Sequence, residues 1–82
     1  MARLIFLGRL RDMTGFSEIS VTAPMSLNEY IESIKVKDGD LHAALTSKGI
    51  RIARNHAIVP IGSDFEFQDQ DEVAFMPPVS GG

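Results

Sequence analysis

One segment of the chain carries an apolar stripe at helical spacing, and this segment limits the folds that the rest of the sequence can adopt. The stripe consists of Leu27, Tyr30, Ile31 and Ile34, at relative positions i, i+3, i+4 and i+7. This spacing predicts an amphipathic helix over residues 27–36. Ser26 stands just before the stripe and Glu29 three positions later, and this pair predicts a capping box at the start of the helix.

Short apolar segments on both sides of this helix are typical of β-strands. They are residues 3–7, 17–22, 50–54, 57–61 and 72–76. We expect the first two to form a hairpin, and the first and last to lie side by side in the centre of a sheet. Pro77 and Pro78 must end the last strand, because proline has no N–H to donate to the ladder. One main helix on one face of a mixed five-stranded sheet makes an α+β fold with two layers.

The connections between these elements are mainly polar. We expect residues 9–15 to form a polar connection that can contain one helical turn, and residues 62–71 to form a loop pinned by Phe65 or Phe67. After the main helix, Asp40 can cap a second short helix with an apolar inner face. The chain shows no linker and no internal repeat, so it is expected to form one domain.

Size and composition exclude several classes of function. With 82 residues and no cysteine, the chain has no disulfide, no thiolate nucleophile and no cysteine-based metal site. A net charge of −3 argues against binding to nucleic acid or to an anionic membrane. No apolar stretch approaches the roughly 20 residues of a membrane span. His42 and His56 have no partner at ligand spacing, so we expect no metal site. The expectation is a cytoplasmic carrier, binding module or subunit.

The end of the sequence, Pro77-Pro78-Val79-Ser80-Gly81-Gly82, is its most distinctive motif. Two prolines favour an extended backbone, and glycines without Cβ atoms can enter a narrow channel. The sequence therefore predicts a folded domain over residues 1–76 and an extended, flexible tail over 77–82. The α-carboxyl of Gly82 would have a pKa of roughly 3.5 and be an unreactive carboxylate at neutral pH. Because no nucleotide-binding glycine loop is present, a partner must activate it.

Residues 71–82, with Gly8-Arg9-Leu10-Arg11 and Asn55 in a hairpin turn, resemble the MoaD/ThiS-type ubiquitin-like family. This family includes the small, sulfur-carrying subunit of molybdopterin synthase. The resemblance implies a β-grasp fold. It has two departures: Gln70 stands where the family often has glycine, and Met76 where a second aromatic residue is common.

The resemblance also implies a role in molybdenum cofactor biosynthesis for the carboxyl of Gly82. An activating enzyme would use ATP to adenylate this group and convert it to a thiocarboxylate, a terminal 1-thioglycine. The tail would then insert into the large synthase subunit, which holds the pterin precursor and the catalytic side chains. The inserted residues would be Pro77, Pro78, Val79, Ser80 and Gly81. The small subunit would be non-catalytic, bind no cofactor itself, and form a two-plus-two hetero-oligomer with the large one.

A docking face follows from strand parity and the resemblance together. Successive side chains point to opposite faces of a strand, so Ala74 and Met76 should face away from the helix if Val73 and Phe75 face it. The resemblance places Leu7, Ile58 and Met76 on the sheet face that docks the large subunit.

Three other functions remain open at this point. The same terminus would serve a sulfur carrier for thiamine, for another sulfur-containing metabolite or for tRNA thiolation. A ubiquitin-like modifier would instead be joined through Gly82 to lysines of target proteins. The fourth reading is a plain interaction domain.

Overall fold

The structure is a computed structural model that describes residues 1–60 and 62–77. Along the chain the elements are β1 (Ala2–Phe6), α1 (Arg9–Thr14), β2 (Glu18–Val21), β3 (Met25–Ser26), α2 (Leu27–Lys37), α3 (Gly39–Leu45), β4 (Arg51–Arg54), β5 (Ala57–Ile58), β6 (Glu66–Phe67) and β7 (Glu72–Met76). The expected order of strands and helices is confirmed, with helix α1 and the two short strands β3 and β6 added.

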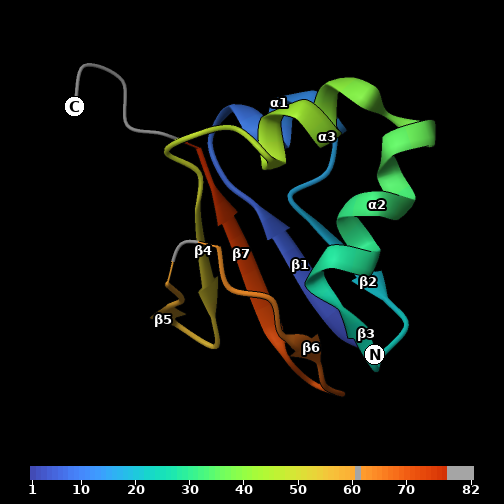
Figure 1. The fold of residues 1–82 in the computed structure, drawn as a ribbon, viewed down its shortest axis with the longest axis vertical. Helices are drawn as coiled ribbons and strands as arrows, with labels where there is room; N and C mark the ends of the chain where they lie inside the picture. The colour runs from blue at the N-terminus through green and yellow to red at the C-terminus, as the bar shows by residue number, and fades with distance from the viewer. Residues whose placement is uncertain (61, 78–82) are drawn as a thin grey trace.

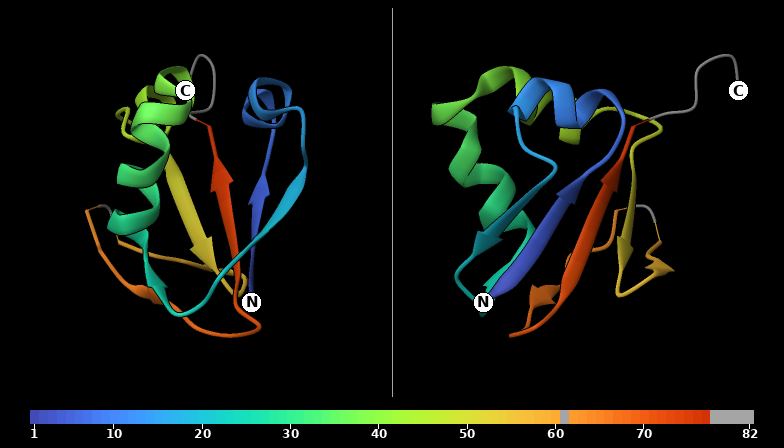
Figure 2. Two further views of the ribbon diagram at one scale, coloured as in Figure 1. Left: turned by 90° about the vertical axis from the view of Figure 1, so that its right-hand side faces the viewer. Right: turned by 180° about the vertical axis from the view of Figure 1, so that it is seen from behind.

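The main sheet has five strands in the order β2-β1-β7-β4-β5, seen side by side in Figure 1. β1 pairs antiparallel with β2 and parallel with β7, and β4 pairs antiparallel with both β7 and β5. The sheet is therefore mixed, and the first and last strands are neighbours, as predicted. β1 and β7 both run toward the end of the molecule where α1 and α3 lie (Figure 2).

The core lies between the helices and one face of the sheet. Its members are Ala2, Leu4, Phe6, Leu10, Leu27, Tyr30, Ile34, Leu41, Leu45, Phe67, Val73 and Phe75. Three aromatic rings join the layers: Phe75 lies 5.6 Å from Phe6 and 6.3 Å from Tyr30 between ring centroids. Offset contacts at these distances add to the free energy of burial. Phe75 of β7 thus packs against both β1 and α2.

The Ser26 cap at the start of α2 agrees with the prediction, whereas the predicted cap of α3 does not. The Ser26 hydroxyl accepts a hydrogen bond from the Glu29 backbone N–H at 3.0 Å. The predicted cap of the second helix, Asp40, is wrong: the Leu41 N–H donates to the carboxylate of Asp38 at 3.0 Å. Asp38 has an extended backbone (φ −151°, ψ 86°), so the chain turns there and helix α3 begins at Gly39.

Two other segments differ from the expectation. Residues 9–15 contain a six-residue helix, α1, which buries Leu10. The polar loop contains β6, which pairs with β3 in a second sheet and buries Phe67. Strands of two residues are too short to show alternation, so only the contact between distant segments reveals them.

Asp71 joins two turns through a buried carboxylate. This carboxylate accepts hydrogen bonds from the Arg54 guanidinium, the Asn55 amide and the Gln68 N–H, all within 3.0 Å. Burial raises its pKa, but these hydrogen bonds and the charge of Arg54 outweigh burial and lower the pKa below its usual value. Arg54 also lies over the Phe65 ring. Asp71 therefore ties the β4–β5 turn to the start of β7.

We expect Asp71→Asn to lower the free energy of unfolding at neutral pH by roughly 2–4 kcal/mol, because an amide cannot accept at both positions. A lowered folded-state pKa stabilises above the unfolded-state value of about 3.9, and this contribution disappears as pH falls through the folded value. Urea unfolding should therefore show the difference from wild type shrinking below about pH 4. Exposed Asp40→Asn is the control. If the two substitutions lowered the free energy of unfolding equally, the stabilising role of the buried Asp71 carboxylate would be contradicted.

Gln70 has a left-handed backbone with φ 73°, and its N–H donates to the Met1 carbonyl at 3.0 Å. This is the position where the resembled family often has glycine. A residue with a Cβ is strained in this conformation by about 1–2 kcal/mol. Gln70 therefore places strain in the turn before β7.

Gln70→Gly should raise the free energy of unfolding by up to about 1 kcal/mol, since part of the relieved strain is offset by greater freedom of the unfolded chain. Gln70→Ala keeps the Cβ and should give no gain. Thermal melts of the three proteins measure this, and a glycine variant less stable than wild type would refute it.

Candidate functional site

The base of the tail extends directly from the central strand. β7 ends at Met76, and half-buried Pro77 follows it. The Leu7 N–H donates to the Phe75 carbonyl at 3.1 Å, which continues the pairing of β1 with β7 to this point. The predicted tail residues Pro78, Val79, Ser80, Gly81 and Gly82 lie outside the described residues. The tail therefore starts from a strand that is paired with β1 on one side and β4 on the other.

The sheet face away from the helices is apolar along its middle. In register, Ala53 lies opposite both Ile58 and Ala74, and Ala74 lies opposite Ile5. Val73 and Phe75, which alternate with Ala74, are fully buried on the other face, as the parity argument predicts. We call this row, with Leu7 and Met76, the open face. Its centre is half-buried, and with exposed Leu7 and Ile58 it forms a surface on which an apolar partner could pack.

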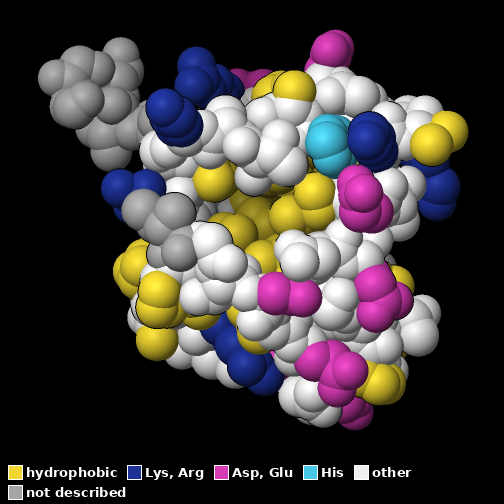
Figure 3. All heavy atoms as spheres, viewed as in Figure 1, with side chains coloured by type: hydrophobic (Ala, Val, Ile, Leu, Met, Phe, Trp, Pro, Cys, Tyr) yellow, Lys and Arg dark blue, Asp and Glu magenta, His cyan; other side chains and the backbone are white. Residues whose placement is uncertain are grey.

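The structure places the three predicted interface residues as follows. Ile58 is 61% exposed on edge strand β5, and Leu7 is 42% exposed just after β1. Met76 is half-buried and lies opposite Arg51 of β4. Hydrophobic side chains are visible at the edge of the molecule where β5 lies (Figure 3). Register brings Ile58 and Met76 to one face, but their role in docking stays a prediction.

Charged side chains pair at the opposite end of the open face. The Arg3 guanidinium contacts the Glu72 carboxylate at 3.0 Å and the Glu18 carboxylate at 3.4 Å. His56 Nε2 lies 3.3 Å from the other oxygen of Glu72. These pairs are partly exposed, so they contribute little to stability. These charged pairs thus lie at the end of the open face away from the tail, whereas Arg51 lies opposite Met76 near the tail.

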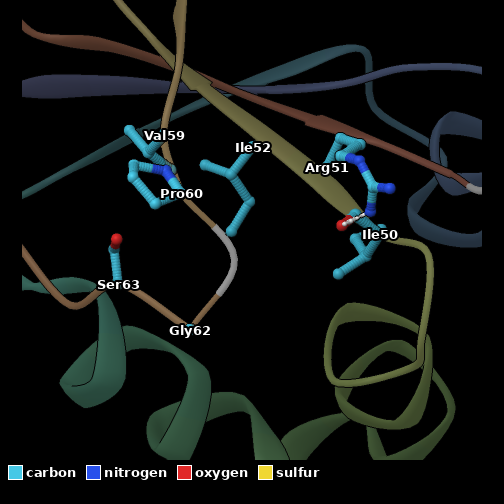
Figure 4. A pocket seen from close by; sticks show the side chains of 7 residues that line it. All are labelled: Ile50, Arg51, Ile52, Val59, Pro60, Gly62 and Ser63. Atoms are coloured by element: carbon cyan, nitrogen blue, oxygen red, sulfur yellow. Dashed lines mark hydrogen bonds between the residues drawn. The ribbon is translucent and has the colours of Figure 1, made fainter.

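Two hollows lie near the start of β4. A groove of about 390 Å³ opens beside the tail base, lined by Arg9, Leu10, Met13, Ala43, Ala44, Ser47, Ile50 and Pro77. The second, of about 60 Å³, lies between β4 and the segment after β5, and its wall is apolar apart from Ser63 and Arg51 (Figure 4). Arg51 donates to the Ile50 carbonyl at 3.2 Å. The smaller hollow has room for only a few water-sized groups.

Metal ligands do not gather in residues 1–60 and 62–77, where no three His, Asp or Glu side chains are close enough to hold an ion. His42 lies 3.7 Å from Glu32, and His56 is paired with Glu72 as described. In the same part of the chain, none of the helices is long and apolar enough to cross a membrane.

Sequence reasoning missed two features of this region. One is the contact between Gly8 and Pro77, which are far apart in sequence. The other is the apolar middle of the open face at Ile5 and Ala53. Alternation within residues 3–7 could have indicated Ile5, since it stands between buried Leu4 and Phe6.

A small domain in which one main helix covers one face of a mixed sheet with a central last strand is a ubiquitin-like β-grasp domain. The small archaeal modifier protein 1 of Methanosarcina acetivorans has the same fold, with a TM-score of 0.77 over 99% of this chain and 95% of that chain, at 23% identity. The ThiS family profile matches residues 4–82, and the chain belongs to this family.

Two curated relatives align along their whole length. They are proteins of Escherichia coli and Haemophilus influenzae, 31% and 29% identical over 83 positions that cover 100% of each chain. Both are named molybdopterin synthase sulfur carrier subunit. This agrees with the family indicated by residues 71–82.

Proposed function

We propose that this protein is the sulfur carrier subunit of a molybdopterin synthase and that the terminal carboxyl of Gly82 carries the sulfur. The observation that carries the proposal is the direct attachment of the glycine-ended tail to β7, the strand held on both sides in the sheet centre. A strand fixed in this way presents its extension from a defined point. The names of the two whole-length relatives support the same function.

The chemistry depends on activation by a partner. The Gly82 carboxylate attacks the α-phosphate of ATP on an activating enzyme, and pyrophosphate leaves. A sulfur donor then displaces AMP from the acyl-adenylate to give the thiocarboxylate. This sulfur is a better nucleophile than the carboxylate oxygen it replaces. The chain has no cysteine to carry a persulfide, so the C-terminus is the credible carrier group.

The acceptor in this proposal is a pterin precursor held by the large subunit. Two transfers from two thiocarboxylates would build its dithiolene, and each carrier would return with a carboxylate at Gly82. Catalytic side chains would come from the large subunit, in a two-plus-two assembly in the cytoplasm. The open face lies next to the tail base, so a subunit that receives the tail would also cover Leu7 and Met76.

Intact mass after co-expression with the activating enzyme tests the proposal. We expect one oxygen to be exchanged for sulfur, localised to Gly82, and consumed on addition of the large subunit and the pterin precursor. Deleting Gly82, or appending one residue after it, should abolish the exchange, because the activated carboxyl is then lost or displaced.

The other outcomes separate the alternative functions. Persistent isopeptide adducts on other proteins would indicate a modifier. A thiocarboxylate that the pterin precursor does not consume would indicate a related carrier pathway. Sulfur delivery that survives the extra residue would refute the role of Gly82.

Docking of the large subunit on the open face gives a second prediction. Ile58→Ala and Met76→Ala should each weaken binding about tenfold, since burying an aliphatic side chain contributes roughly 1.5–3 kcal/mol and about 1.4 kcal/mol is a factor of ten. Val36→Ala is the matched control, because Val36 is 93% exposed on α2. Calorimetric titration of the large subunit measures the three affinities. An unchanged affinity for Met76→Ala would count against this face.

A further inference from the structure

Gly8 links β1 to α1 with a backbone that side chains rarely adopt. Its φ is 57° and its ψ is −135°, and it occupies the N-cap position of α1 without a side-chain cap. This combination lies outside the left-handed helical region that asparagine and aspartate tolerate. A glycine is therefore required by the backbone alone.

A second constraint at Gly8 comes from the base of the tail. A Cβ added to Gly8 would lie 3.0 Å from Cγ and 3.6 Å from Cδ of Pro77, and the first distance is shorter than ordinary van der Waals contact. The proline ring is bonded to the backbone at both Cα and nitrogen. A steric displacement of Cγ therefore also displaces the backbone of Pro77.

The hydrogen bond from the Leu7 N–H to the Phe75 carbonyl, 3.1 Å long, holds these two segments together just before they pass each other. Leu7 and Phe75 thus cannot separate to make room without breaking this bond. The displacement therefore falls on Pro77, which lies beyond this bond.

We propose that Gly8 is a positioning residue that sets the direction in which the tail leaves β7. Its missing side chain lets Pro77 pass close to the start of α1, and this contact fixes the point from which the tail starts. The inference rests on the proposed carrier function, because it needs a reaction at the end of the tail.

Gly15 provides the comparison within the same helix. It caps the C-terminal end of α1 with φ 77° and ψ 3°, and a Cβ there would meet no atom within 4 Å. Gly39 and Gly62 have equally open surroundings. A substitution at Gly15 therefore strains a positive φ without touching the tail.

The test is a double-mutant cycle of Gly8→Ala with Pro77→Ala, run beside one of Gly15→Ala with Pro77→Ala. Alanine at 77 lacks Cγ and Cδ, so it removes the collision but not the backbone strain at residue 8. The readouts are kcat and KM for thiocarboxylate formation by the activating enzyme, from intact mass, and thermal melting of each variant.

We expect Gly8→Ala to lower kcat roughly three- to tenfold with KM within about threefold of wild type, because the Cβ displaces Pro77 by a few tenths of an ångström and a misplacement of about 1 Å can cost about 10²-fold. Pro77→Ala should restore most of this loss: Gly8→Ala should lower kcat much less in the Pro77→Ala background than in the wild-type background. The Gly15 cycle should be additive, with Gly15→Ala close to wild type in kcat.

Three outcomes would overturn the inference. The first is a Gly8→Ala variant with the kcat of Gly15→Ala, and the second is a loss that Pro77→Ala does not restore. If Gly8→Ala fails to fold, recovery of melting in the double variant supports the contact and its absence overturns it. Wild-type protein that gains no sulfur would instead refute the carrier function and the positioning role with it.

Discussion

The structure depends on the pairing of β7 with strands on both sides. It is parallel to β1 and antiparallel to β4, so the last strand occupies the centre of the sheet. Parallel neighbours cannot be joined by a tight turn, so the intervening chain must cross over, and α2 covers one face on the way. Phe75 of this strand packs on both Phe6 and Tyr30, so strand pairing and the packing of the two layers depend on one residue.

The two faces of β7 have different surroundings. Val73 and Phe75 are buried under the helices, whereas Ala74 and Met76 lie on the open face. A domain of this size has one small core, so the second face is available to a partner. Because the same strand also carries the tail, a partner that received the tail as proposed would lie next to Leu7 and Met76 of this face. The paired charges of Arg3, Glu18 and Glu72 lie at the far end.

Local patterns predicted the elements whose signals are contained in a few neighbouring residues. The stripe from Leu27 to Ile34 and the Ser26 cap predicted α2, and alternation with a closing proline predicted β7 to the residue. The cap of α3 was placed at Asp40 instead of Asp38, because either aspartate suits the sequence and only the path of the chain selects one. The pairing of Met25 with Phe67 had no local signal, since each strand is two residues long.

The sequence by itself determined the helix stripe, the strand alternation and the composition of the tail, because each is a property of residues close together in the chain. The absence of a thiol follows from composition alone. Only the tertiary structure decided that Asp71 would join two turns, that Ile5, Ala53 and Ala74 would form one row, and that Gly8 would lie against Pro77. These contacts join residues separated by many positions. Strand register and the crossing of two segments bring them together, and neither is encoded in any single segment.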